Sequence, residues 1–536
     1  MRDARFTRRT ALRAAGAGIA AGALGIGSAI ADQGKTPAQG KTAVVIGSGF
    51  GGAVAAYRLG TAGIKTIVLE RGRRWPITAA GDTFCSSAAP DRRAAWFSDS
   101  PVLSPLQQTT RIERYAGVLD AVRGNGLVTQ YGAGVGGGSL VFGGFLAQPR
   151  RRDFEATFPR ELDYTELADV YYARARKNLG GSPLPADILA TPEYQGARSW
   201  LQDVADAGME PHFFDFCIDW DVVRAELAGE RVRSIAIAEM NNGTNSGAKN
   251  SVDRNYLLWA EQTGNVTVNP LHEVTEIRES GRQFTVSVRQ IDEFGTTLGN
   301  TQVVADYLFM AAGSYYTPAL LVSAKAKGHL RNLNQHVGQG YGTNGDFLFN
   351  RLNNRRPYGA THGGPGVALV YDDTHERGSI SMAWQAVPPV GGIDLNSLTT
   401  HLIITDPQHR GSIDYNSALG RAELNYPWPE GNEADLRSQW MASRFKQFAD
   451  DRHGFTANGV PVWPRQIGMG SYSSYHGLGG MVMGKACTTD GVVHGYDNLF
   501  VVDGSLLPGS AALVNPSLTV AAFAERCMDK FLTAPR

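Results

Sequence analysis

Cysteine is scarce in this sequence, and no two cysteines lie close together. The 536 residues include four, at positions 85, 217, 487 and 527, and none belongs to a C-x-x-C pair. Zinc sites and dense disulfide frameworks both need clustered cysteines, so both are excluded. The eleven histidines are also dispersed, without the spacing of metal ligands, and we expect no metal. Stability must therefore come from packing.

The chain also has no formal net charge. The 51 Lys and Arg residues equal the 51 Asp and Glu residues in number, and no basic block, RNP-like or zinc-finger pattern interrupts the balance. The chain lacks the basic footprint of a nucleic-acid-binding protein, so no nucleic-acid partner is expected. A G-x-S-x-G elbow between a strand and a helix is absent too, which argues against a serine hydrolase.

Length and composition favour a large enzyme. With 43% hydrophobic residues and 64 glycines, the chain is too apolar for a disordered protein. It is also too long for one ordinary core. We therefore predict two domains, or one large two-layered enzyme.

Residues 1–31 have the pattern of an export signal. Thr7-Arg8-Arg9-Thr10-Ala11-Leu12 is followed by an Ala/Gly-rich stretch and by Ala29-Ile30-Ala31, an A-x-A cleavage site. This pattern predicts a twin-arginine signal peptide, recognised by the twin-arginine export machinery, and a secreted mature protein. A membrane helix is the alternative, but Ala and Gly are too weakly hydrophobic for a stable membrane span. Residues 32–40 are then a short linker.

A glycine-rich motif follows, in a context typical of dinucleotide binding. Residues 42–46 are a β-branched run that predicts a strand, and residues 53–62 have helix-forming composition. A second predicted strand, 64–69, ends in Glu70 at about the distance that the motif requires. The candidate cofactor-binding residues of this motif are Gly47, Gly49, Phe50, Gly51, Gly52 and Glu70.

The residues of this motif have separate physical roles. Gly47 permits the tight turn, Gly49 lets the backbone approach a pyrophosphate, and Gly52 lets the helix pack closely on the strand. The helix N-terminus stabilises the phosphate charge, and Glu70 should accept hydrogen bonds from a ribose. A glycine turn without a ligand is the alternative interpretation.

A second glycine-rich segment, 131–141, bears on which dinucleotide is bound. It is too rich in glycine for a helix interior and too apolar for a solvated linker. We expect its backbone to press against something flat or charged, for which a flavin ring and its pyrophosphate are suited. A flexible surface loop is the alternative. The candidate cofactor-binding residues are Gly134, Gly136, Gly137, Gly138 and Ser139.

Further elements indicate a cofactor domain assembled from separated pieces. Strands are predicted at 266–268, 284–288, 306–313 and 498–504, and helices from about Thr317 and from Leu518. The stretches between them hold most of the Trp and many of the Tyr residues, which suits a layer that covers a substrate. We predict cofactor-binding segments at 41–160, 261–345 and 466–536, and substrate-binding segments at 161–260 and 346–465.

The motifs together resemble those of the glucose-methanol-choline (GMC) family of flavin oxidoreductases, and within it the bacterial cholesterol oxidases. The resemblance runs from about Lys41 to the end of the chain. It implies an α/β fold, with a Rossmann-type FAD-binding domain and a discontinuous α+β substrate-binding domain. It also implies FAD as the cofactor and removal of a hydride from an alcohol carbon. The seven ordered motifs are 47–52 with Glu70, 134–141, Ala312-Gly313-Ser314, Asn332-Leu333-Asn334, 474–480, 503–509 and Val514-Asn515-Pro516.

The resemblance also implies roles for particular residues. His476 would accept or steer the hydroxyl proton while the hydride moves to flavin N5, a task that suits an imidazole. Asn515 would donate a hydrogen bond to developing negative charge. Taken alone, His476 would more often be structural, and Asn515-Pro516 would be a turn before the last helix. The cofactor-binding candidates that the resemblance adds are Phe142, Gly143, Asp503, Gly504, Asn515 and Pro516.

Three positions depart from the family pattern. The segment 381–389 lacks the glutamate that isomerises a steroid double bond, and Trp384 or Gln385 takes its place. Neither side chain is a carboxylate base, so isomerisation should be inefficient. Phe142 replaces a polar neighbour of the flavin, which should alter the redox potential or the reactivity with oxygen. His476-Gly477 replaces His-Pro, which should loosen the backbone at the proposed base.

The leading hypothesis is a secreted FAD-dependent oxidase or dehydrogenase that converts a bulky, mostly apolar secondary alcohol, such as a sterol, to a ketone. Its electron acceptor would be oxygen or another molecule. A flavin dehydrogenase of a secondary metabolite, with a non-oxygen acceptor, is one alternative. A catalytically decayed flavin-binding protein is the other, and retention of both His476 and Asn515 argues against it.

Overall fold

The computed structural model describes residues 40–102, 110–352, 356–376, 378–389, 394–427, 437, 440–441, 458–460 and 472–534. The predicted signal peptide, residues 1–31, and all of the predicted linker except Gly40 lie outside the described residues. Within the described ranges, no helix is long and apolar enough to cross a membrane. In the same residues, no three His, Cys, Asp or Glu side chains gather as metal ligands would, and all four cysteines are buried and free.

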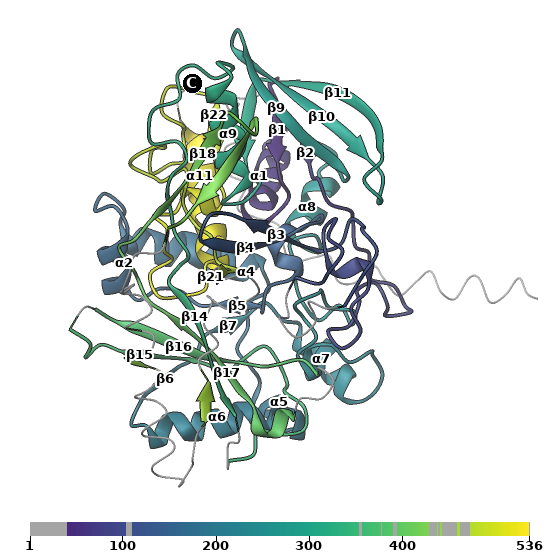
Figure 1. The fold of residues 1–536 in the computed structure, drawn as a ribbon, viewed down its shortest axis with the longest axis vertical. Coiled ribbons are helices and arrows are strands. Elements are labelled where there is room, and N and C mark those ends of the chain that lie inside the picture. The colour runs from purple at the N-terminus through teal and green to yellow at the C-terminus, as the bar shows by residue number, and fades with distance from the viewer. Residues whose placement is uncertain are drawn as a thin grey trace, which may run out of the picture.

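A five-stranded parallel sheet forms the centre of the upper half of the molecule in Figure 1. Three separate stretches of chain supply its strands, as the sequence predicts for a Rossmann-type cofactor domain. Most of its residues are buried, because helices cover the sheet and its apolar side chains face apolar neighbours. In spatial order the strands are β22 (Leu499–Val501), β12 (Tyr307–Met310), β1 (Thr42–Ile46), β2 (Lys65–Leu69) and β8 (Val266–Asn269).

Three helices pack beside this sheet. α1 (Phe50–Thr61) follows the first glycine motif directly, α8 (Tyr256–Gln262) precedes β8, and α11 (Ser517–Thr533) lies near the end of the chain. α1 contacts both other helices. Residues 51–56 of α1 are all buried, and five of the six are Gly or Ala. Small side chains let neighbouring backbones approach α1 closely.

An antiparallel meander of three strands, β9 (His272–Ser280), β10 (Gln283–Ile291) and β11 (Thr297–Ala305), extends from this half at the top of Figure 1. The sequence predicts only 284–288 in this region. β10 alternates buried with more exposed residues, whereas β11 is exposed almost throughout. Only β10 therefore carries the period-two signal by which a half-buried strand is predicted.

A six-stranded antiparallel sheet dominates the lower half of Figure 1. Side chains alternate between its two faces. Trp384 is fully buried beside Gly196 of α6 (Gln195–Asp206), whereas the next residue, Gln385, lines the cavity described below. In spatial order the strands are β20 (Asn458–Val460), β14 (Asp346–Leu352), β17 (Thr399–Ile404), β16 (Ile380–Gln385), β15 (Leu369–Asp372) and β6 (Pro211–His212).

Smaller elements complete the two halves. One sheet holds β21 (Tyr472–Ser474), β4 (Leu127–Gly132) and β3 (Leu119–Arg123); another holds β13 (Gln339–Tyr341), β18 (Gly411–Asn416) and β19 (Arg421–Asn425), beside α9 (Tyr316–Ala326). The rest are β5 (Phe145–Leu146), β7 (Asp215–Phe216), α2 (Arg151–Thr157), α3 (Tyr164–Glu166), α4 (Ala173–Asn178), α5 (Ala186–Leu189) and α7 (Trp220–Leu227). The predicted domain boundaries stay predictions.

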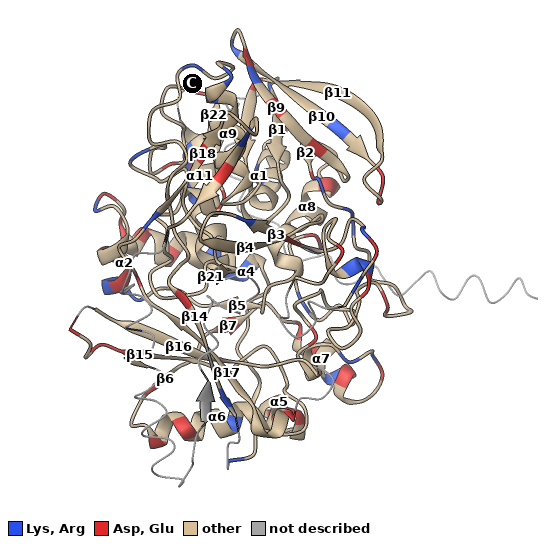
Figure 2. Ribbon diagram, in the orientation of Figure 1, with Lys and Arg blue, Asp and Glu red and all other residues tan. Residues whose placement is uncertain are grey.

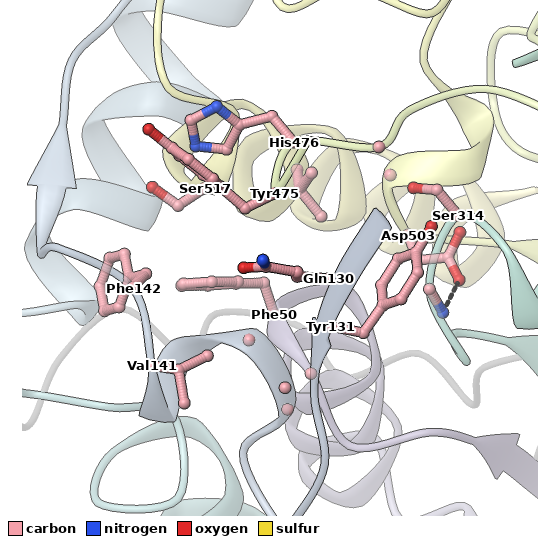
Figure 3. Close-up of a pocket in the computed structure, with 18 of the residues that line it drawn as sticks. Phe50, Gln130, Tyr131, Val141, Phe142, Ser314, Tyr475, His476, Asp503 and Ser517 are labelled. Atoms are coloured by element: carbon pink, nitrogen blue, oxygen red, sulfur yellow. Dashed lines mark hydrogen bonds between the residues drawn. The ribbon is translucent and has the colours of Figure 1, made fainter. Parts of the chain in front are cut away.

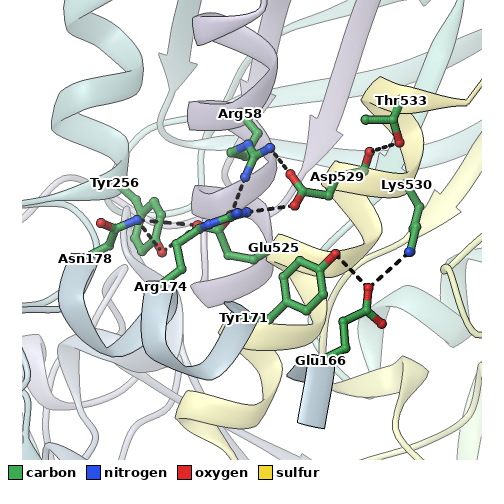
Figure 4. A network of polar contacts seen from close by, with 10 residues as sticks. All are labelled: Arg58, Glu166, Tyr171, Arg174, Asn178, Tyr256, Glu525, Asp529, Lys530 and Thr533. Atoms are coloured by element: carbon green, nitrogen blue, oxygen red, sulfur yellow. Dashed lines mark hydrogen bonds and ion pairs between the residues drawn. The ribbon is translucent and has the colours of Figure 1, made fainter. Parts of the chain in front are cut away.

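A network of charges around the buried Glu525 ties α1, α4, α8 and α11 together (Figure 4). The fully buried side chain of Glu525 accepts hydrogen bonds from Arg58 at 2.7 Å, from Arg174 at 3.3 Å and from the Tyr256 hydroxyl at 2.8 Å. Asp529, one turn further along α11, pairs with the same two arginines. Elsewhere, charges of both signs are interspersed over the molecule (Figure 2).

Candidate active site

A cavity of about 490 Å³ opens at the carboxyl ends of the parallel strands. Its wall includes the residues that directly follow β1, β2 and β12, together with Asp503 and Gly504 shortly after β22, since parallel strands end at one edge of their sheet. Other walls come from the second glycine segment, from β14 and β16, and from the turn after β21. Open α/β sheets bind their ligands at this edge.

The first glycine motif forms one wall of this cavity. The residues of the motif that line the wall are Gly47, Gly49, Phe50 and Gly51, and Gly52 lies behind them. A Cβ on Gly47 would overlap the backbone of Ala311, and one on Gly52 would overlap the Gly47 carbonyl. A Cβ on Gly49 would find only the Cα of Gly137, at 4.0 Å, because this residue faces open space. α1 begins here without a side-chain cap, so its first N–H groups remain available to an anion.

The second glycine segment is mostly buried and is not a flexible surface loop. Gly134, Gly136 and Gly137 have φ values of +150°, +114° and +53°, in the range that favours glycine. Ser139 Oγ donates a hydrogen bond to the Gly136 carbonyl at 2.7 Å and accepts one from Val252 N at 3.0 Å. Ser139, Gly134 and Gly136 therefore shape the segment from behind. Of the predicted cofactor-binding residues in and just after this segment, those that line the cavity are Gly137, Gly138, Phe142 and Gly143.

Glu70 lines the cavity but is already hydrogen-bonded within the protein. Its Oε2 accepts hydrogen bonds from Ser48 Oγ at 2.6 Å and Ser48 N at 3.1 Å, and its Oε1 accepts one from Gly72 N at 2.8 Å. Ser48 Oγ also accepts a hydrogen bond from Gly136 N at 3.1 Å, so the carboxylate links both glycine segments. Burial raises the pKa of Glu70. Its hydrogen bond to a ribose stays a prediction.

Asp503 joins the ends of two strands to α9. Its Oδ2 accepts hydrogen bonds from Gly313 N at 2.8 Å and Thr317 Oγ1 at 2.6 Å, and its Oδ1 accepts one from Ser505 N at 2.9 Å. Burial raises the pKa of Asp503. The cavity-lining candidates from this part of the chain are Asp503, Gly504, Asn515 and Pro516.

His476 and Asn515, the two predicted catalytic residues, lie side by side at the cavity. Nε2 of His476 is 3.5 Å from Nδ2 of Asn515, and Nδ1 of His476 is 2.9 Å from Oδ1 of Asp346. Figure 3 shows the rings of His476 and Tyr475 above those of Phe50 and Phe142. The catalytic roles of His476 and Asn515 stay predictions, but their separation suits joint action on one group.

The turn at His476-Gly477 is hydrogen-bonded and closely packed, and the expectation of a loose backbone there stays a prediction. His476 N donates a hydrogen bond to Ser474 Oγ at 3.1 Å. A Cβ on Gly477 would overlap the hydroxyl of Tyr341, which hydrogen-bonds the Tyr131 hydroxyl at 2.8 Å. Glycine therefore makes room here for a pair of tyrosines, with which a proline ring would collide.

The cavity wall near His476 is apolar and aromatic. Phe142 contacts Phe50 edge to face, with their ring centroids 5.2 Å apart. Gln385 faces the cavity and donates a hydrogen bond from Nε2 to the Tyr475 hydroxyl at 3.4 Å. Of the two candidates for the position of the missing glutamate, Gln385 is therefore the one at the cavity. The wall continues through Phe145, Phe347, Leu348, Pro365 and Ala386.

Asp346 is a site residue that the sequence does not predict. It follows Asn344-Gly345 and begins β14, a pattern that signals a turn and a strand start but no chemistry. Its partner His476 lies 130 positions away. Local pattern cannot reveal a contact at this separation.

Two independent observations indicate that FAD fits the cavity. Cβ atoms on Gly49 and Gly138 would meet almost nothing, which leaves a cradle between the two glycine segments. Asn515 Oδ1 is buried, and no described residue hydrogen-bonds it. A buried oxygen without a partner is costly unless a ligand or water satisfies it.

Comparison with known proteins decides the family. Models described as GMC oxidoreductase match residues 109–339 and residues 407–524. The chain belongs to the GMC oxidoreductase family. Members bind FAD and oxidise alcohols, so this GMC oxidoreductase is an FAD-dependent enzyme that acts on an alcohol.

Two similar relatives are named cholesterol oxidase. That of Mycobacterium tuberculosis (strain ATCC 25618 / H37Rv) is 26% identical, over 90% of this chain and 89% of the relative. That of Acinetobacter baumannii is 24% identical, over 91% of this chain and 93% of the relative. The relationship therefore extends along nearly the whole GMC oxidoreductase.

Two solved structures share the fold. Pyridoxine 4-oxidase, described as from Mesorbium loti, has a TM-score of 0.63 and 17% identity, covering 92% of this chain and all of that one. A fungal aryl-alcohol oxidase has a TM-score of 0.61 and 14% identity, covering 92% of this chain and 98% of that one. These likenesses establish the predicted fold class of the GMC oxidoreductase.

Proposed function

We propose that this GMC oxidoreductase oxidises a bulky, mostly apolar secondary alcohol of the sterol type to a ketone. The observation that carries the proposal is the pairing of His476 with Asn515 beside a wall of Phe and Leu side chains. That wall can bury the hydrocarbon part of a substrate, whereas His476 and Asn515 provide one hydrogen-bond acceptor and one donor for a single hydroxyl. The two relatives named cholesterol oxidase support the same substrate class.

The chain's own residues divide the work between binding and proton transfer. Bound FAD supplies the acceptor for the hydride that leaves the alcohol carbon. His476 accepts the hydroxyl proton at Nε2, because its Nδ1 is engaged by Asp346. Asn515 Nδ2 donates a hydrogen bond to the oxygen as negative charge develops there. The aromatic wall keeps water from the reacting carbon.

Oxidation without efficient isomerisation is part of this proposal. Moving a double bond requires a base that carries a proton between two carbons of the steroid. Gln385 occupies the cavity at the relevant position, and its amide cannot accept that proton. We propose that the unconjugated ketone is the main product of a 3β-hydroxy-Δ5 steroid.

Export belongs to the proposal as well. The pattern Thr7-Arg8-Arg9-Thr10-Ala11-Leu12 and the A-x-A site before Asp32 support twin-arginine secretion. Expression of the full chain in a twin-arginine-competent bacterium should yield extracytoplasmic protein that begins near Asp32. Replacement of Arg8 and Arg9 by Lys should keep the protein in the cytoplasm.

His476→Ala tests the catalytic assignment. The variant should keep FAD, because the glycine motif is separate from His476, while anaerobic flavin reduction by cholesterol slows by about 10²- to 10⁴-fold. Asn515→Leu should also slow reduction, and the double variant should fall short of the product of the single effects. Reduction of the His476→Ala flavin at the parent rate would show that the histidine is structural.

A further inference from the structure

We infer that Asp346 is a positioning residue that fixes the tautomer of His476 and stabilises its protonated form during proton transfer. The inference rests on the proposed function, because His476 acts as the base only there. It adds a carboxylate that neither the sequence motifs nor the comparisons assign. Its basis is the contact of Asp346 with one ring nitrogen while the other faces Asn515 and the cavity.

Asp346 is held rigidly at the start of β14. Its side chain is 4% exposed, and that of His476 is 13% exposed. Asp346 pairs with Ile404 of β17 in the antiparallel sheet. Ser474 Oγ lies 3.3 Å from Asp346 Oδ2 and accepts the hydrogen bond of His476 N. Asp346 and Ser474 thus clamp both the ring and the backbone of His476.

The contact decides which nitrogen carries the proton. A carboxylate accepts hydrogen bonds only, so Nδ1 of His476 must donate to Asp346 Oδ1. In the neutral ring, the lone pair then lies on Nε2, which faces the Asn515 amide and the cavity. When Nε2 takes the proton of the alcohol, the resulting positive ring lies next to a negative carboxylate. This arrangement favours the charged form by direct attraction.

No other charge competes at this pair among the described residues. The ion pair of Asp346 there is with His476 alone. The titratable groups that face the pair are the hydroxyls of Tyr341 and Tyr475. Burial raises the pKa of Tyr341 to about 12 and raises that of Tyr475 further. The more distant Tyr131 also has a pKa raised by burial. All three tyrosines therefore stay neutral over the working pH range, and Asp346 alone supplies the charge.

The decisive variant is Asp346→Asn in the FAD-loaded enzyme. Its amide keeps the size of the side chain but removes the negative charge. The rate of anaerobic flavin reduction by cholesterol is measured across pH for the parent, Asp346→Asn and His476→Ala. We expect the plateau rate of Asp346→Asn to fall by about 10²-fold, and its acid limb to move by about one pH unit toward lower pH. A merely structural loss would lower the rate without moving the limb.

Asp153→Asn is the matched control. Asp153 is a buried carboxylate on α2 that pairs with Arg150 and does not line the cavity. This variant should keep the parent rate and the parent pH profile. FAD content and thermal midpoint are recorded for every variant.

Nitrogen NMR of the holoenzyme labelled with ¹⁵N-histidine provides a readout without substrate. The His476 signal is assigned by its loss in His476→Ala. The parent should show the Nδ1–H tautomer, and Asp346→Asn should lose this preference. If Asp346→Asn does not fold, the parent spectrum alone decides, because an Nε2–H tautomer overturns the inference.

The outcomes separate the two proposals. Parent-like flavin reduction in His476→Ala overturns the proposed function. A slow His476→Ala together with a parent-like rate and pH profile in Asp346→Asn overturns the role of Asp346 alone. If cholesterol does not reduce the parent flavin, the substrate class is wrong, and the NMR tautomer still tests Asp346.

Discussion

Gly49 offers a test of cofactor binding that leaves the fold untouched. Its backbone, with φ −70° and ψ −167°, is open to any residue, and a Cβ there projects into the cavity. We expect Gly49→Ala to fold normally but to lose FAD, since the methyl group occupies the place of closest approach. The absorbance ratio of flavin to protein after purification measures the loss. Gly299→Ala on β11, where a Cβ also meets nothing, should purify fully yellow.

Substitution of Gln385 should restore the steroid isomerisation that we expect the parent to lack. Gln385→Glu places a carboxylate at the cavity wall with almost no change in shape. With a 3β-hydroxy-Δ5 steroid, we expect the parent to release mainly the unconjugated ketone and Gln385→Glu to form more of the conjugated enone. Ultraviolet absorbance of the enone reports this reaction. Trp384→Glu, on the buried face, should not gain it, and rapid enone formation by the parent would contradict the prediction.

Single residues were predictable where their role is local. Gly47 and Gly52 follow from a turn and a strand within a few positions, and the structure gives each the close contact that excludes a Cβ. The structure also places His476 beside Asn515, as the family motifs imply. Asp346 and the Tyr341 hydroxyl beneath Gly477 could not be predicted, because those contacts depend on how distant strands are packed.

At the level of elements, the loop before β15 is attached to the following segments by a buried histidine. His362 donates a hydrogen bond from Nε2 to the Leu395 carbonyl at 2.9 Å, and its Nδ1 accepts one from Val387 N at 3.3 Å. The bond to Leu395 needs a proton on Nε2, and the bond from Val387 needs a lone pair on Nδ1, so only the neutral ring makes both. Burial lowers the pKa of His362 to about 4.

This histidine should make the enzyme sensitive to acid. Between pH 6.5 and 4 the unfolded state binds the proton and the folded state resists it, so the stability is present above pH 6.5 and is lost toward pH 4. From pH 6.5 to pH 5 the parent should lose about 2 kcal/mol through this group. Urea unfolding measures the stability of each protein at both pH values. Between pH 6.5 and pH 5, His362→Gln should lose less stability than the parent, by about that amount, whereas the exposed control His494→Gln should lose as much as the parent. Equal losses in all three proteins would remove His362 as the cause.

The elements that the sequence predicts best are those with a strong local period. The β1-α1-β2 unit is correct to within a few residues, because an apolar strand, a glycine turn and a helix follow in one short stretch. β6 is a two-residue strand that pairs with β15 about 160 positions later. Nothing in so short a segment distinguishes it from a loop, so only its partner defines it.

At the scale of the whole molecule, stability should depend on the buried carboxylate of Glu525 and the groups that it joins. Glu525→Ala leaves the buried Tyr256 hydroxyl without its acceptor and leaves Arg58 paired with Asp529 alone, and a buried group that loses its hydrogen-bond partner costs about 1–3 kcal/mol. The midpoint of urea unfolding at fixed FAD concentration measures this loss. Glu166→Ala removes the partly exposed pair with Lys530 from the same region and should cost less than about 1 kcal/mol. Similar effects of both substitutions would contradict the proposed dependence on burial.

The discontinuous parallel sheet has a consequence for biosynthesis. The glycine motif at 47–52 is made early, but β22 and Asp503, which complete the same sheet edge, are about 450 residues further on. At roughly 5–20 residues per second, translation separates the two by about 20 to 90 seconds. A nascent chain therefore has a pyrophosphate turn but no enclosed site. FAD should therefore bind only after the complete polypeptide has left the ribosome. Cells starved of riboflavin should accumulate full-length apoprotein rather than ribosome-bound fragments.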